Sequence, residues 1–229
     1  SGSVGAANYE ILKLALYSFV RDLPFGSNAV RIGLIEFSGI SDLENQLLGD
    51  PYPNTNLKDV AIQDTIDLDD YNEATKGDLL NYILDLNYSA PRCGNSADPA
   101  CAPIESQYTG LNERLYTCIS CSMQYMLDEY FPTPGNVANN SVGVLRERFL
   151  LFIGDGVPTR GNPLDPQVPT QQLRAAYPFK FIFVPITGNT GFDESIFGTA
   201  YDDTIDTTLV VDDYSNLNNT LRDINFNCL

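Results

Sequence analysis

The chain has 229 residues, of which 43% are hydrophobic, enough to bury one sizeable core but too few to suggest two. Thirty acidic residues against thirteen basic ones give a formal net charge of −17, which would repel the phosphates of nucleic acid and an anionic membrane surface. No apolar run is long enough to span a bilayer. We therefore expect a single domain over residues 1–229 that neither binds nucleic acid nor inserts into a membrane.

Helical and strand-like patterns alternate along the chain. Helical periodicity is found at residues 9–23, 74–86, 111–130, 171–176 and 214–224. Apolar runs typical of strands occupy residues 30–37, 61–68, 149–153, 179–186 and 208–211, and residues 39–56 read as a loop. This alternation predicts an α/β fold with a doubly wound, mostly parallel central sheet flanked by helices, in which ligands bind beyond the carboxyl ends of the strands.

Three polar segments occur where such ligands would bind. They are Ser1-Gly2-Ser3 before the first helix, Thr109-Gly110-Leu111-Asn112 before a later helix, and Asp155-Gly156 after a strand. Their hydroxyl and carboxylate oxygens suit Mg²⁺, Mn²⁺ or Ca²⁺ better than zinc, because no histidine or cysteine is among them. The simpler alternative is that Ser3 and Thr109 are helix N-caps.

The cysteines and the glycosylation patterns favour the secretory route. N-glycosylation patterns begin at Asn87, Asn139 and Asn218. The chain has five cysteines: Cys93, Cys101, Cys118, Cys121 and Cys228. Export favours oxidation, so the sequence predicts disulfides.

The first four cysteines predict two disulfides that staple a loop insertion at about residues 90–108 to the helix that follows. Cys118 and Cys121 are three apart on one predicted helix face, so we expect each to reach into the insertion and not to pair with the other. Cys228 is expected to pair outside residues 1–229. A four-thiolate zinc site and a redox pair at Cys118 and Cys121 are the alternatives.

Four segments in a fixed order resemble one known family. They are SGSVGAANYEILK, VRIGLIEFSG, the region from LNYSA to YTGLNERLYTC, and FLLFIGDGVPT. In that order they are similar to the metal-binding opening with its helix, the second strand, the threonine loop and the strand that delivers the second aspartate of the von Willebrand factor type A (VWA) domains. The resemblance covers essentially the whole chain and implies a Rossmann-like VWA fold.

The resemblance implies a metal site with one free coordination position. Ser1 and Ser3 would bind the ion through their hydroxyls, Thr109 would do so in at least one conformational state, and Asp155 would lie beside it. Mg²⁺ is the expected ion, with Mn²⁺ and Ca²⁺ as alternatives. Neutral hydroxyl ligands leave a divalent cation under-neutralised, so the free position would take a carboxylate from a protein or extracellular-matrix partner.

The resemblance also places the family's first strand, which runs through the middle of the sheet, before Ser1. We expect a segment connected directly to Ser1 to supply this strand and the opening aspartate. The alternative is a strand donated by a neighbouring chain.

The sequence therefore predicts an extracellular module, secreted or on the cell surface, that serves metal-dependent adhesion or recognition. The alternative function is a structural subunit of an extracellular filament or matrix, able to self-assemble, in which the metal site is idle or only stabilising. An enzyme is not expected, because the chain has no histidine to act as a general base and no paired carboxylates flanking a pocket-like motif.

Overall fold

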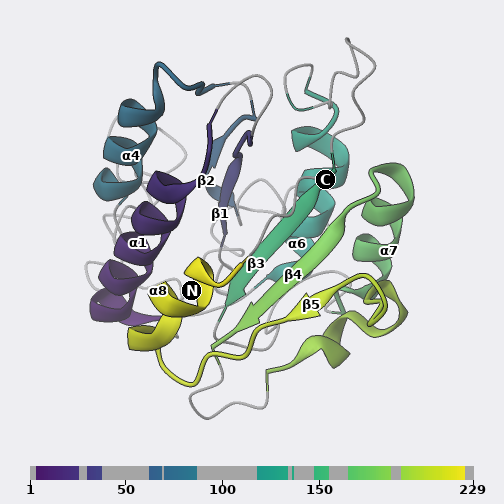
Figure 1. Cartoon of the computed structure of the whole chain (residues 1–229). Helices are drawn as coiled ribbons and strands as arrows, with labels where there is room; N and C mark the ends of the chain where they lie inside the picture. The colour runs from purple at the N-terminus through teal and green to yellow at the C-terminus, as the bar shows by residue number, and fades with distance from the viewer. Residues whose placement is uncertain are drawn as a thin grey trace, which may run out of the picture.

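The computed structural model describes residues 4–25, 30–37, 62–68, 70–86, 118–133, 136, 147–154, 165–186 and 192–224. The strands of these residues form two groups (Figure 1). Strands β1 (Leu34–Phe37) and β2 (Ile62–Ile66) form an antiparallel pair. Strands β3 (Phe149–Gly154), β4 (Lys180–Pro185) and β5 (Thr207–Thr208) form a parallel sheet in the order β3-β4-β5.

The parallel three-stranded sheet confirms the predicted α/β class, and the β1–β2 pair is antiparallel. A parallel partner needs a crossover connection, usually a helix, while an antiparallel partner needs only a loop. The 24 residues between Phe37 and Ile62 carry no helical pattern in the sequence, which agrees with the antiparallel pairing of β1 and β2.

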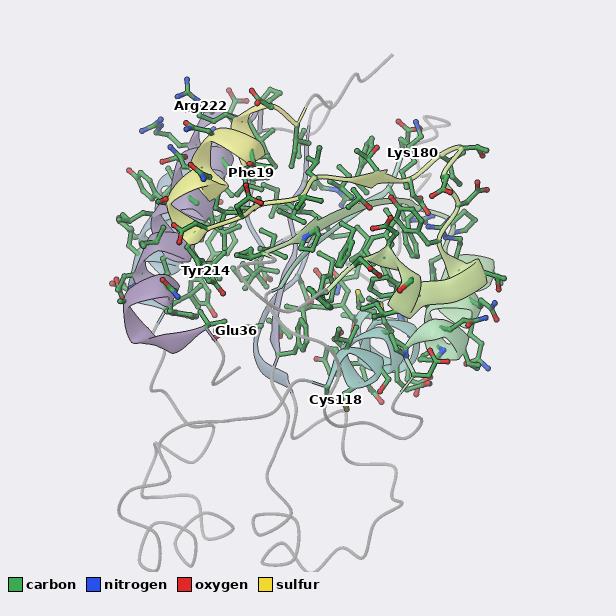
Figure 2. All side chains as sticks on the ribbon, turned by 90° about the horizontal axis from the view of Figure 1, so that it is seen from below. Phe19, Glu36, Cys118, Lys180, Tyr214 and Arg222 are labelled. Carbon is green, nitrogen blue, oxygen red and sulfur yellow. A yellow bond between two sulfur atoms is a disulfide. The ribbon has the colours of Figure 1, made fainter. Side chains whose placement is uncertain are left out.

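Helices cover the strands on two sides (Figure 1). One side has α1 (Gly5–Asp22), α4 (Lys76–Asp85), a 3₁₀ turn η3 (Tyr214–Asn216) and α8 (Leu217–Arg222). The other has α6 (Ile119–Tyr125), its π-helical continuation η1 (Met126–Tyr130), α7 (Gln167–Ala176) and the 3₁₀ segment η2 (Glu194–Ala200). In the view from below, Phe19 and Tyr214 lie beside α1 and α8, and Cys118 lies at the start of α6 (Figure 2).

Successive side chains of the strands pack alternately against two apolar clusters. On β4, Ile182 and Val184 belong to the cluster under α1, α4 and α8, while Phe181 and Phe183 belong to the cluster under α6, α7 and η2. The strand period of two residues produces this division. The same alternation runs through β1 and β3: Leu34, Leu151 and Ile153 pack on the first cluster, and Ile35, Phe37, Leu150 and Phe152 on the second. The two strand groups therefore share the same two faces.

Strands β1 and β3 are less buried than β4. Every residue of β4 after Lys180 is buried, whereas Phe152 is the one buried residue of β3 and β1 has none. Within the described residues no strand lies between β1 and β3, and the two do not pair. A strand covered by helices on both faces becomes fully buried only when it also has neighbours on both edges, and among the described residues β1 and β3 each pair on one edge only.

Candidate functional site

Two contacts bring the start of α1 to the carboxyl ends of β1 and β3. The Tyr9 hydroxyl, in the second turn of α1, donates a hydrogen bond of 2.9 Å to Glu36 Oε1 near the end of β1. The ring of Phe37, the last residue of β1, lies 5.5 Å from the ring of Phe152, centroid to centroid. Carboxyl ends of strands and the amino end of a helix thus meet on one side of the molecule, which is where α/β folds bind ligands.

The end of β3 is held tightly on this side. Ile186 N donates to Gly154 O at 2.7 Å, which extends the β3–β4 pairing to the last residue of β3. A Cβ built on Gly154 would lie 3.0 Å from the Phe152 ring and 3.4 Å from the buried Phe192 ring. Glycine is therefore suited to this position, because the packing leaves little room for a side chain.

The four predicted metal ligands, Ser1, Ser3, Thr109 and Asp155, lie outside the described residues. Two of the segments nevertheless adjoin described residues on the side of the molecule just described. Val4 directly follows Ser3 and packs on the first apolar cluster, and Gly154 directly precedes Asp155. Within the part of the chain that the structure describes, no three cysteine or carboxylate side chains are grouped so as to hold a metal ion.

The expected disulfide pairing requires a correction. The structure joins Cys118 to Cys121, with a Cα–Cα distance of 5.3 Å, where we expected each to reach into the 90–108 insertion. The expectation assumed that both residues lie within one regular helix over 111–130. Cys118 instead precedes α6 as its N-cap, with φ −113° and ψ 82°, and this non-helical backbone turns its side chain toward Cys121. Cys93, Cys101 and Cys228 lie outside the described residues.

One of the three predicted glycosylation positions can be located. Asn218 is the second residue of α8 and is half-buried, and its Oδ1 is buried with no hydrogen-bond partner among the described residues. Asn87 and Asn139 lie outside the described residues.

Buried polar residues that the sequence reasoning did not single out hold the elements together. Asn136 is fully buried; its Nδ2 donates to Asp67 Oδ1 at 2.6 Å and to Tyr130 O at 2.9 Å, and its Oδ1 accepts from Leu68 N at 2.6 Å. The Tyr130 hydroxyl donates to the carbonyl of Ile66 at 2.7 Å. These bonds attach the end of β2 to the segment after α6. The residues that join β2 to this segment are more than sixty positions apart, so no local pattern could have shown these contacts.

A second buried polar group lies between α7 and the parallel sheet. The side chain of Asp206 is fully buried and accepts hydrogen bonds from Arg174 Nη2 at 2.6 Å, from Phe181 N at 2.8 Å and from Asp202 N at 2.8 Å. Arg174 also lies over the Phe179 ring, 4.9 Å from its centroid. This carboxylate is therefore structural and not free for a ligand.

Comparison with known proteins identifies a fold and no family. No protein-family model matches the chain, and no curated protein matches it in sequence. Among solved structures, the chain is similar to proximal thread matrix protein 1 (PTMP1) from the mussel byssus, with a TM-score of 0.58 and 17% sequence identity over 97% of this chain. The likeness covers 44% of PTMP1, so the chain spans less than half of that protein. At this identity the likeness shows the fold alone.

Within the described residues, no helix combines the length and the apolar character that crossing a bilayer requires.

Proposed function

We propose that the chain is a structural module of an extracellular matrix or filament, built on a VWA-like fold. The observation that carries this proposal is the likeness, over 97% of the chain, to a protein whose name describes it as a thread matrix protein. Five cysteines and three glycosylation patterns add support for an extracellular location. We propose no enzymatic activity for it.

Metal-dependent adhesion is the second candidate. Its support is that the start of α1 lies near the carboxyl ends of β1 and β3. Ser1 and Ser3 precede α1 in the sequence, and Asp155 follows β3. In this proposal Mg²⁺, or alternatively Mn²⁺ or Ca²⁺, is bound by Ser1, Ser3, Thr109 and Asp155 and binds a partner carboxylate.

Assembly in the presence and absence of a chelator separates the two candidates. The purified protein is concentrated in buffer containing Mg²⁺ or EDTA, and its assemblies are followed by light scattering and electron microscopy. A structural module forms the same assemblies in both buffers. Assemblies that form only with Mg²⁺, or none in either buffer, would contradict the structural role.

The adhesion candidate has its own test in the Asp155→Ala variant. If Asp155 lies beside the ion, calorimetry will show weaker Mg²⁺ binding by this variant with an unchanged circular dichroism spectrum, because an acidic residue that directly follows a strand is expected in a loop outside the core. Unchanged affinity would rule out the proposed metal site.

A further inference from the structure

Strand β5 forms one outer edge of the parallel sheet (Figure 1). Its ladder to β4 continues beyond Thr208, through Leu209 N donating to Phe183 O at 2.8 Å and Val211 N donating to Pro185 O at 2.9 Å. In an extended strand the N–H and C=O of successive residues point to opposite sides, so Thr208 and Val210 direct theirs away from β4. No strand of the described residues pairs with that side.

Two large apolar side chains of this segment are exposed. Val210 is 59% exposed and Ile205 is 48% exposed. Soluble proteins commonly protect edge strands with lysine or proline, because a bare edge is a template for another strand. Residues 202–213 contain neither residue type, so the edge lacks this protection.

Carboxylates flank the edge at both ends. Asp202 and Asp203 precede β5, Asp212 and Asp213 follow it, and all four are exposed. No lysine or arginine occurs between residues 181 and 221. Hydrogen bonds from Thr204 lower the pKa of Asp202, and hydrogen bonds from Ser215 lower the pKa of Asp213, so both remain ionised at neutral pH. The charged side chains of residues 202–213 are therefore all acidic.

We propose that the outer edge of β5 binds an extended, basic polypeptide segment by strand addition. The backbone of the segment pairs with Thr208 and Val210, its apolar side chains cover Val210, and its lysines or arginines meet the flanking aspartates. A second copy of the same edge is a poor partner, because like charges would face each other. This inference names a partner and does not depend on the proposed structural role.

Fluorescence anisotropy with a labelled synthetic peptide of alternating lysine and valine tests the proposal on the full chain. We expect saturable binding that weakens as salt rises, because the aspartates are exposed and screened. A peptide with glutamate in place of lysine should not bind. A lysine–valine peptide with N-methylated amides should also fail, because it cannot form a strand ladder. Equal binding of the N-methylated peptide would overturn strand addition, since charge alone would then explain the affinity.

A matched pair of variants locates the site. Val210→Lys places a positive charge, the same sign as the lysines of the peptide, at the centre of the edge. It should weaken peptide binding about tenfold or more. Val168→Lys changes an equally apolar residue, 49% exposed, on α7 and should leave binding unchanged. Circular dichroism checks that both variants fold. If folded Val210→Lys binds the peptide like the unmodified chain, the proposal is wrong; the assembly experiment above is unaffected by that result.

Discussion

At the scale of single residues, Gly33 lies against the hydroxyl of Tyr130. A Cβ built on Gly33 would overlap the Tyr130 hydroxyl oxygen. It would also lie 3.0 Å from the carbonyl oxygen of Ile66, which accepts the hydrogen bond of that hydroxyl. Gly33→Ala should therefore lower the free energy of unfolding by about 2–4 kcal/mol, through overpacking and the loss of a buried hydrogen bond. Urea denaturation measures the change.

The control for Gly33→Ala is Gly77→Ala. Gly77 lies in α4, and a Cβ there would meet nothing within 4 Å. This variant should be about 0.5 kcal/mol more stable, because alanine favours the helix. Equal effects of the two substitutions would contradict the close packing at Gly33.

Single residues also show which features could be predicted from the sequence and which could not. The apolar run before Asp155 predicted strand β3, because periodicity is local. The buried roles of Asn136 and Asp206 depend on partners brought close only by the fold. The pairing of Cys118 with Cys121 depends on one non-helical residue at the start of α6, which a regular helical pattern did not reveal.

At the scale of elements, a lysine of α1 caps the C-terminal end of α4, and a lysine of α4 caps the C-terminal end of α1. Lys13 Nζ donates to the carbonyls of Leu84 and Leu86, each at 3.0 Å, at the end of α4. Lys76 Nζ donates to the carbonyls of Arg21 at 2.6 Å and Leu23 at 2.7 Å, at the end of α1. Both helices were predicted from their periodicity, but their mutual capping was not, because it joins residues more than fifty positions apart.

Replacing Lys13 tests the capping. Lys13→Met keeps the aliphatic stem but leaves two carbonyls without their charged donor, so we expect a loss of about 2 kcal/mol in unfolding free energy. Glu10→Gln removes only the 3.0 Å ion pair between Lys13 and a carboxylate that is 60% exposed, and should change little. Thermal and urea unfolding of both variants provide the measurement. If Glu10→Gln lowers the unfolding free energy as much as Lys13→Met does, the stabilisation comes from the ion pair and not from the cap.

Asp213 gives a pH-dependent prediction. Its carboxylate accepts from Ser215 N at 2.8 Å as the N-cap of η3, and hydrogen bonding from the side chain and then the backbone of Ser215 lowers its pKa below the ordinary 3.8. The stabilisation is complete above pH 3.8 and is lost as the pH falls through the lowered pKa, because the unfolded chain takes up the proton first. Asp213→Asn retains an uncharged acceptor, so the difference in melting temperature between the original chain and this variant should change only in that acid range. A difference that is constant down to acid pH would contradict the capping role.

At the scale of the whole molecule, the two strand groups pack against the same two apolar clusters. Their side chains alternate between these clusters, and both β1 and β3 are half-buried. The order of elements could be predicted from the sequence because helical and strand periods differ. The antiparallel direction of β2 and the separation of the sheet could not, because pairing is set by connections and neighbours far apart in the chain.

The proposed VWA-like fold is tested most directly by a segment designed to supply a strand between β1 and β3. The chain is extended before Ser1 by an apolar, β-branched segment ending in Asp-x, and amide hydrogen exchange is compared with that of the original chain. We expect the amides of β1 and β3 to become protected to the level of β4, while β4 and β5 stay unchanged. A matched extension with glycine and serine in place of the apolar residues should give no protection. Unchanged exchange in β1 and β3 with the apolar extension would contradict the VWA-like fold.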